Sequence, residues 1–300
     1  MKAKTFLPSL SCLLTYTIFG FSFLFSRIAL DYTTPPTLLA IRFLVAFAVL
    51  NLLCLFPKNR LHLRGKPVGK LLLMGFVQPI LYYTCENYGI AKTSASFSGI
   101  LLGTIPVIGL LLGRIFLHEK CTPFRIACAV LSVVGVALTT VGGETIASPV
   151  GTVLLLLAAG SSAYFTVLSR SISGDFTPFE RTYMMFALGS LFFTGLAVFQ
   201  NRGDLSALFA PLRIPAVCGS VLYLSVVSSV LAFFLLNYAM QAVSVGTASV
   251  FSNFCTVVSL LAGVLLLHES FSVPQIIGIC IILLSVFGVS MPEKSKSAQE

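Results

Sequence analysis

Charged residues are scarce in this sequence: they make up only 10% of its 300 residues, whereas apolar residues make up 57%. A soluble domain usually carries about 25% charged residues and about 45–50% apolar residues. So few charges cannot cover the surface of a soluble protein of this length, which excludes soluble enzymes, disordered chains and coiled coils. What remains is a bundle of helices in a lipid bilayer, and we predict an all-α integral membrane fold.

Motifs for metal binding, disulfide formation and nucleotide hydrolysis are also missing. The eight cysteines are scattered, mostly within apolar runs, and no CxxC pair occurs, so neither a disulfide framework nor a zinc site is expected. Only three histidines are present, no HExxH motif occurs, and no ATP-binding motif is found. We therefore predict no catalytic residues, no cofactor, no metal and no direct hydrolysis of ATP.

Negative charge is scarcer than positive charge, and the net charge is +9. In a soluble protein such an excess would suggest a nucleic-acid partner. Here the basic residues cluster between apolar runs, where they act as orientation signals at a membrane face, so no nucleic acid is expected as a partner.

The charge-free run from Thr5 to Ser26 has 22 residues. It is longer than the core of a usual signal peptide, and we interpret it as an uncleaved first span.

Apolar windows of about 20 residues, the length that crosses a bilayer, recur along the whole chain. Every connection between them is short, so no loop can hold a soluble catalytic domain. Lys and Arg residues concentrate in alternate connections, 14 on the side of the N-terminus against 4 on the other, which predicts a multi-pass protein of the cell (inner) membrane with both termini cytoplasmic. The ten predicted spans are residues 8–30, 37–56, 70–91, 95–117, 123–141, 150–170, 179–199, 214–239, 245–267 and 273–291.

The two halves of the chain share polar residues at a constant offset of 150 positions. Asn87-Tyr88 falls on Asn237-Tyr238, and Leu117-His118-Glu119 falls on Leu267-His268-Glu269. Matches between leucines of apolar helices carry little information, but a shared Asn-Tyr and a shared Leu-His-Glu at one offset indicate an internal repeat.

Residues 1–145 and 146–300 are therefore predicted to be two five-helix repeats. Because five is odd, the second repeat must be inverted relative to the first. The charges agree: Arg114, Lys120 and Arg125 flank the first His-Glu turn, as expected inside, and no Lys or Arg flanks the second. Inverted repeats with a binding site at their interface are the architecture of many secondary transporters.

Each of the two repeats carries several short motifs. The first repeat carries Phe19-Gly20-Phe21-Ser22, Pro36, Arg42, Tyr88, Thr93-Ser94-Ala95-Ser96, Pro106 and Leu117-His118-Glu119-Lys120, and the second carries Gly151, Ala163-Tyr164, Tyr238, Ser244, Ala248 and Leu267-His268-Glu269. Over nearly the whole chain this pattern resembles the EamA family of the drug/metabolite transporter superfamily. The chain departs from the family in having no tryptophan and in having Thr256 where the second repeat often has proline. The resemblance implies a ten-helix inner-membrane permease for small metabolites, with a central cavity between the repeats.

Polar side chains within the predicted spans are the candidates for substrate binding or gating, because burying them in lipid without partners is costly. Arg42 and Glu86 each lie about five residues, or about 7–8 Å, from the outer end of a span. Two interpretations stay open for them: a side chain that snorkels to the headgroups, or a gate or substrate contact. We also expect Glu86 to approach Arg42, with Arg27 as a competing partner. The full candidate set is Arg42, Gln78, Tyr82, Glu86, Tyr164, Tyr223 and Asn253.

The fourth predicted span contains features of close helix packing. Gly99 and Gly103 form one GxxxG pair and Gly109 and Gly113 form another, and small residues at this spacing let helix backbones approach in lipid. Pro106, in the middle of the span, is expected to kink it.

Glu119 and Glu269 stand just before the starts of the fifth and tenth spans. We interpret each of them as part of a turn and of the start of the helix that follows, next to Thr122-Pro123 and Ser272 respectively.

The function that these features favour is a secondary carrier of small organic solutes that works by alternating access in the lipid bilayer. The substrate stays open among amino acids, nucleotide-like metabolites, amines and drugs, and coupling to a proton or another ion and assembly into a homodimer are also left open. The alternatives are an integral-membrane enzyme and a membrane sensor or scaffold. The enzyme is disfavoured because inversion puts His118 and His268 at opposite membrane faces, where they cannot form one site.

Overall fold

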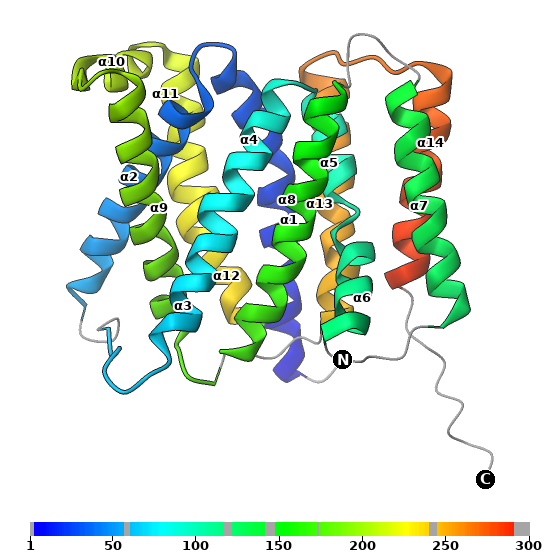
Figure 1. Cartoon of the computed structure of the whole chain (residues 1–300), viewed down its shortest axis with the longest axis horizontal. Helices are drawn as coiled ribbons and strands as arrows, with labels where there is room; N and C mark the ends of the chain where they lie inside the picture. Colours follow the sequence, from blue (N-terminus) through cyan, green and yellow to red (C-terminus); the bar gives the residue numbers. More distant parts are fainter. Residues whose placement is uncertain are drawn as a thin grey trace.

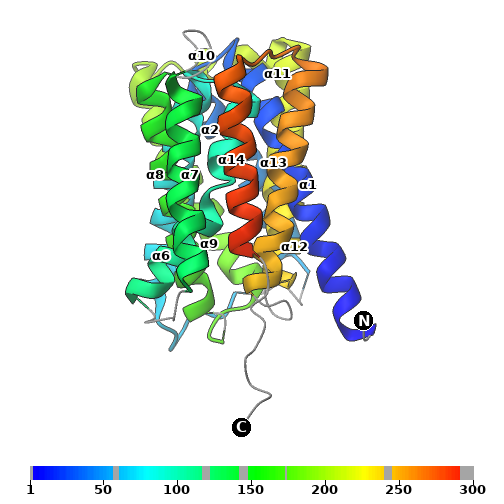
Figure 2. The same ribbon diagram turned by 90° about the vertical axis from the view of Figure 1, so that its right-hand side faces the viewer.

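The computed structural model is a bundle of upright helices (Figures 1 and 2). It describes residues 3–56, 61–116, 122–141, 148–172, 174–239 and 245–290. We call the end of the bundle at which α1 begins the lower face and the opposite end the upper face, as in Figure 1. The helices are α1 (Ala3–Leu30), α2 (Pro35–Cys54), α3 (Val68–Gly75), η2 (Phe76–Tyr82), α4 (Tyr83–Ala91), α5 (Ala95–Leu102), α6 (Ile105–Phe116), α7 (Pro123–Val141), α8 (Pro149–Ser171), α9 (Pro178–Gln200), α10 (Leu205–Phe209), η3 (Ala210–Arg213), α11 (Pro215–Leu222), η4 (Tyr223–Leu231), α12 (Ala232–Ala239), α13 (Val245–Leu266) and α14 (Val273–Ser290).

Many of these helices are apolar enough to cross a membrane. Six candidate spans of at least 18 residues are found in the described part of the chain, at Leu7–Leu30, Pro35–Cys54, Val68–Ala91, Pro149–Ser169, Pro178–Gln200 and Pro215–Ala239. Shorter apolar helices cover Ala95–Gly109, Ile126–Gly135, Phe254–Leu266 and Val273–Ser285. The predicted all-α membrane class is therefore confirmed, and each apolar helix falls within or overlaps a span predicted from the sequence.

A short helical segment at the upper face, α10 with η3, was not predicted. The Asp204 carboxylate starts it, because it accepts hydrogen bonds from the backbone N–H of Ser206 (2.8 Å) and of Ala207 (3.4 Å) as a helix N-cap. Together with the Ser206 hydroxyl, these groups lower the pKa of the Asp204 carboxyl, so it stays charged at neutral pH.

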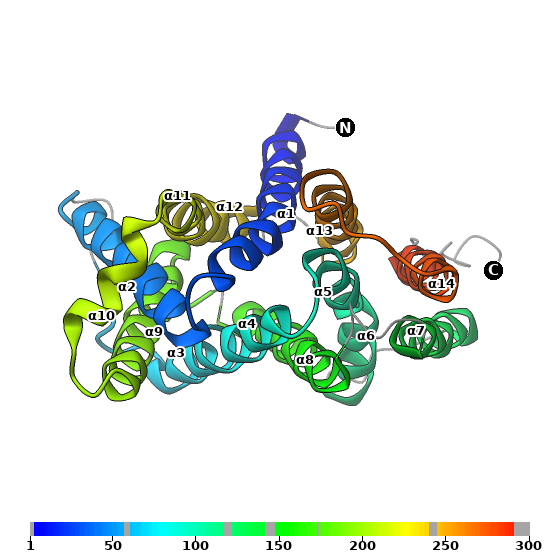
Figure 3. The same ribbon diagram turned by 90° about the horizontal axis from the view of Figure 1, so that it is seen from above.

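Two groups of helices form the centre of the bundle. The α1 group consists of α1 with α11, η4, α12 and α13, and the α8 group consists of α8 with α3, η2, α4, α5 and α6. The pair α2 and α9 packs on one side of both groups, and the pair α7 and α14 lies on the other side (Figure 3). Helices α5 and α13 pack directly against each other, so they join the two groups.

The helix α3–α4 and the helix α11–α12 are both interrupted by a π-helical segment. The two segments are η2, over residues 76–82, and η4, over residues 223–231. Subtracting the offset of 150 from the second range gives 73–81, which overlaps the first. Short π segments within α-helices occur frequently at functional sites.

The predicted close packing of the fourth span is confirmed at Gly99 and Gly103. A Cβ atom on Gly99 would overlap the side chain of Ser259, and one on Gly103 would overlap the hydroxyl of Thr256. The Thr256 hydroxyl also donates a hydrogen bond to the Gly99 carbonyl (3.3 Å). At Gly109, by contrast, a Cβ atom would meet nothing within 4 Å, so the expected packing role of Gly109 is wrong.

This difference predicts opposite outcomes for two alanine substitutions. Gly99→Ala should destabilise the protein by about 1–3 kcal/mol, because the added methyl group overfills the contact between α5 and α13. Gly109→Ala is the matched control and should leave stability unchanged or slightly raised, since alanine favours a helix over glycine by about 1 kcal/mol. Thermal unfolding in detergent measures both, and equal midpoints for the two variants would contradict the packing described.

Pro106 breaks its span, as expected. Helix α5 ends at Leu102 and α6 begins at Ile105. Proline has no N–H to donate to the carbonyl four residues earlier, and its ring clashes with that carbonyl. The Thr104 hydroxyl donates to the Leu101 carbonyl (2.6 Å) at the break, which satisfies a backbone acceptor there.

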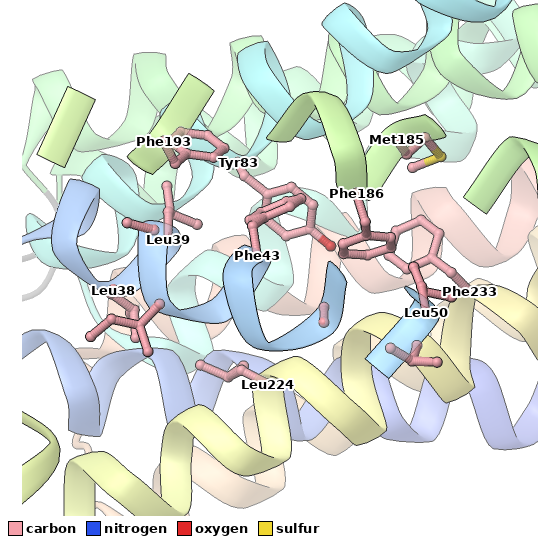
Figure 4. Close-up of a cluster of buried hydrophobic side chains, with 14 of the residues drawn as sticks. Leu38, Leu39, Phe43, Leu50, Tyr83, Met185, Phe186, Phe193, Leu224 and Phe233 are labelled. Atoms are coloured by element: carbon pink, nitrogen blue, oxygen red, sulfur yellow. The ribbon is translucent and has the colours of Figure 1, made fainter. Parts of the chain in front are cut away.

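An aromatic cluster holds α2 against α4 and α9 (Figure 4). Phe43 is fully buried, and its ring centroid lies 5.1 Å from that of Phe186, 5.2 Å from that of Phe193 and 5.3 Å from that of Tyr83. Because Phe43 is fixed on three sides, the rotation of α2 about its axis is fixed too. The neighbouring residue, Arg42, is thereby held in one direction.

Candidate functional site

The Arg42 guanidinium lies inside the bundle, with only 2% of the residue exposed. Its Nε donates to the Ser229 hydroxyl (3.0 Å), and its Nη2 donates to the hydroxyls of Ser228 (3.2 Å) and Tyr83 (3.3 Å). Its Cζ atom also lies 4.5 Å from the centroid of the Tyr83 ring, which is a cation–π contact. The interpretation that Arg42 snorkels to the headgroups is therefore wrong.

The hydroxyls around Arg42 connect α2 with α1, α4 and η4. Ser228 and Ser229 belong to η4, Arg42 to α2, and the Ser22 hydroxyl of α1 donates to Ser228 (2.7 Å). A π segment has a wider turn than an α-helix, with i→i+5 hydrogen bonds, so consecutive side chains diverge less in direction. This geometry lets both serines of η4 face one guanidinium. Ser225, in the same segment, is fully buried and its hydroxyl has no hydrogen-bond partner.

The Glu86 carboxylate is the second buried charge of the site, with 7% of the residue exposed. Its Oε1 accepts a hydrogen bond from the Tyr82 hydroxyl (2.7 Å), and its Oε2 accepts one from Asn87 Nδ2 (3.3 Å). These contacts show that Glu86 does not face lipid.

The expected contact between Glu86 and an arginine is not formed. Neither Arg42 nor Arg27 lies within 4 Å of the Glu86 carboxylate, although Arg42 is near enough to interact with it electrostatically. Two adjacent tyrosines separate the charges: Tyr83 takes the guanidinium and Tyr82 takes the carboxylate, with ring centroids 5.0 Å apart. The predicted direct pair is therefore replaced by two charges that each have neutral partners.

Arg27 has a different partner at the upper face. Its Nη1 donates to the carbonyls of Ile90 and Ala91 (both 3.3 Å), and its Nη2 lies 3.4 Å from a carboxylate oxygen of Asp31. A cation at this place complements the unpaired carbonyls at the C-terminus of α4. Arg27 therefore has a capping role and does not compete for Glu86.

Tyr82 and Gln78 lie about one and two helical turns before Glu86 in the same helix. The spacing of four residues between Gln78, Tyr82 and Glu86 places them along one side of the helix. Gln78 is 4% exposed, and its Oε1 has no hydrogen-bond partner. An unsatisfied buried acceptor lowers the stability of a protein by about 1–3 kcal/mol. The Gln78 oxygen is therefore available to accept a hydrogen bond from a bound molecule. Tyr82 is partly exposed and packs between the two main hydrophobic clusters.

The other three candidates lie on η4, α8 and α13. The Tyr223 hydroxyl donates to the Ile18 carbonyl (2.9 Å) and its ring stacks on Phe25 at 4.2 Å between centroids, so Tyr223 joins η4 to α1. Tyr164 lies in α8 and is partly buried against the same hydrophobic cluster as Tyr223. Asn253 lies in α13, and its side chain is outside the described residues.

Several partners in the site were not predicted. Ser22, Ser229 and Cys255 have no charge or unusual spacing that would mark them in a sequence. Cys255 lies within electrostatic range of both Glu86 and Tyr223, so α13 also reaches the site. Within the described residues, no group of three or more His, Cys, Asp and Glu side chains could hold a metal ion.

Two further buried charges, in the first turn of α9, have structural partners. Glu180 accepts from Lys66 Nζ (2.8 and 2.9 Å), from the His62 N–H (2.8 Å) and from the Thr177 N–H (2.8 Å). Arg181 Nη1 donates to the hydroxyl (2.9 Å) and the carbonyl (3.2 Å) of Ser169. Glu180 and Arg181 therefore hold the lower end of α9 in place and are not part of the candidate site.

An apolar helical bundle with buried charges and polar side chains at its centre is typical of α-helical membrane transporters, in which ionisable residues at such depth mark substrate or ion pathways. The EamA-like transporter family matches residues 7–141 and again residues 149–291. The chain therefore belongs to the EamA-like transporter family, as two consecutive copies of the family's unit. It is a multi-pass membrane transporter of the drug/metabolite type, its environment is the lipid bilayer, and its substrate is a small molecule.

Relatives agree with this assignment, and a solved structure has a similar fold. The uncharacterized transporter YcxC of Bacillus subtilis (strain 168) is 32% identical over 287 residues, which are 93% of this chain and 92% of the relative. A probable terminal-alkyne amino-acid exporter of Streptantibioticus cattleyicolor is 25% identical over 187 residues, 62% of this chain and 61% of the relative. The fold is similar to that of a protein known from its crystal structure, with a TM-score of 0.63, 15% identity and 96% of both chains covered.

Proposed function

We propose that this protein is a secondary-active permease of the cell (inner) membrane that moves a small organic metabolite by alternating access. The observation that carries the proposal is the pair of buried, separated charges, Arg42 and Glu86, together with the unsatisfied Gln78 acceptor two turns before Glu86. Their partners come from both halves of the chain, with Tyr82 and Tyr83 from the first and Ser228 and Ser229 from the second. A site shared between two halves is one that their relative movement can open to either side.

Ten spans arranged as two inverted five-helix repeats, residues 1–145 and 146–300, would supply that movement. The two family matches and the overlapping π segments support the repeat. The helix contacts support it as well. The first span packs on the ninth, as α1 on α13. In the repeat, the sixth span is the counterpart of the first and the fourth span is the counterpart of the ninth. These two counterparts also pack on each other, as α8 on α6. The excess of Lys and Arg in alternate connections favours cytoplasmic termini.

Each side chain has a proposed role in this site. Arg42 orients an anionic or polar group of the solute, Glu86 holds a cationic group or a coupling proton, and Gln78 and Tyr82 position the solute between them. Tyr164, Tyr223 and Asn253 are proposed to line the path. The substrate class stays among amino acids, nucleotide-like metabolites, amines and drugs; the amino-acid exporter among the relatives supports solutes of this size.

The test is transport by the purified protein in proteoliposomes. A panel of labelled amino acids, nucleosides, amines and cationic drugs is offered with and without a pH gradient. We expect at least one solute to cross faster than in empty liposomes, without ATP, and to exchange against the same unlabelled solute inside. If no solute of these four classes moves under either gradient while the protein stays folded, the proposed function is wrong.

A further inference from the structure

A carboxylate from the second half of the chain caps a helix of the first half at the upper face. Glu269, in the connection after α13, accepts hydrogen bonds from the N–H of Ala95 (2.9 Å, to Oε1) and of Ser96 (3.0 Å, to Oε2). These are the first two residues of α5, whose N-cap is Ser94. Unpaired N–H groups and the helix dipole make this end of a helix a favourable place for a negative charge.

The local chain is shaped for this contact. His268 has a positive φ of 53°, which non-glycine residues rarely adopt, and the Glu269 N–H donates back to the Gly263 carbonyl (3.1 Å). A Cβ atom on Gly263 would overlap both the Ser96 hydroxyl and the Glu269 carboxylate. Glu269 lies in the turn before α14, which begins at Val273 after Ser272 as expected, but its carboxylate caps α5 and not its own helix. Gln275 takes that role for α14, because its Oε1 accepts from the Ser272 N–H (2.9 Å).

We propose that Glu269 is a gating residue: its two hydrogen bonds hold the upper face closed, and they break when that face opens during transport. The inference rests on the proposed alternating access. Glu269 follows α13 of the α1 group, whereas α5 belongs to the α8 group, so this contact joins the two groups that must separate at the upper face. Glu269 is partly exposed, so water can replace both of its bonds as the face opens.

The residue of the first half that corresponds to Glu269 at the offset of 150 is Glu119. Glu119 lies outside the described residues, so the proposal concerns Glu269 and the upper face.

Hydrogen–deuterium exchange of the full chain in lipid nanodiscs tests the gate without needing a substrate. Glu269→Gln keeps the size of the side chain and removes its charge. We expect exchange to become about fivefold faster in the first turn of α5 and in the facing upper ends of α1 and α13. We also expect slower exchange in α6 and α12 at the lower face, because opening one face closes the other.

Asp204→Asn is the matched control, since Asp204 caps a helix at the same face within its own half. It should speed exchange in α10 alone. Gly263→Ala provides a second route to the open upper face, because the added Cβ atom would overlap the Glu269 carboxylate, and it should reproduce the pattern of Glu269→Gln.

Faster exchange confined to the first turn of α5 in both Glu269→Gln and Gly263→Ala would show that Glu269 is only a structural cap and would overturn the gate. That result would leave the proposed transport function intact, because solute transport by the unmodified protein is measured separately.

Discussion

Transport by the Glu86→Gln variant is expected to be about 10- to 100-fold slower than by the unmodified protein, with folding retained. Glutamine has the size of glutamate and can still accept the hydrogen bond from Tyr82, so the packing around residue 86 should persist. What is lost is the negative charge, and hydrogen bonds to charged groups contribute about 1.5–3 kcal/mol, which corresponds to this range in rate. Initial rates in proteoliposomes measure it, for a solute that the panel shows to be transported.

Tyr82→Phe is the matched control for this prediction. It removes one hydrogen bond to Glu86 and leaves the charge in place, so we expect a loss of less than about 10-fold. If Glu86→Gln transports as fast as the unmodified protein, Glu86 is a structural residue and the proposed centre of the site is wrong.

Arg42→Lys is expected to lose nearly as much transport as Arg42→Ala, although lysine keeps the positive charge. The guanidinium uses two nitrogens at fixed angles to bind Ser228, Ser229 and Tyr83, and a single ammonium on a flexible chain cannot reproduce this arrangement. The alanine variant should also be less stable by about 1–3 kcal/mol, because the buried hydroxyls lose a partner. Initial rates and thermal unfolding are measured together, and full activity of the lysine variant would show that only the charge matters.

Exchanging the two charges is expected to fail. If Arg42 and Glu86 were a direct ion pair, an Arg42→Glu, Glu86→Arg double variant would recover transport that each single variant loses. In this structure Arg42 has hydroxyl partners from η4 and α4, and Glu86 has its own partners, so neither exchanged side chain would find suitable groups. Recovery in proteoliposomes above the rate of both single variants would show that the two charges meet in another conformation.

Hydropathy and charge were enough to predict much of the fold. The helices follow the apolar windows, and the 150-residue offset matches the two family repeats. The break before Pro106 was also predictable, because it depends on one residue and its own backbone. The short helix after Asp204 was missed, since an apolar window cannot detect a five-residue segment outside the membrane.

The partners of the site residues could not be predicted in the same way. The sequence marked Arg42 and Glu86 as unusual, but their surroundings depend on π segments that leave no periodic signal. The bond from Arg42 to Ser229 spans 187 positions of the chain, and that from Ala95 to Glu269 spans 174. A local interpretation of Glu269 therefore chose the helix next to it, whereas the native partner comes from the other half.

Labelling of Cys255 from each side of the membrane tests alternating access to this site most directly. Cys255 lies within electrostatic range of Glu86, Tyr82 and Tyr223, and the other seven cysteines can be replaced by serine to leave it as the sole thiol. A membrane-impermeant maleimide is added either outside or inside oriented proteoliposomes, with and without the transported solute. Our account predicts that Cys255 reacts from both sides, and that Glu269→Gln speeds the outside reaction and slows the inside reaction. Reaction from one side only, with no effect of the solute, would contradict a central site that opens in turn to each face.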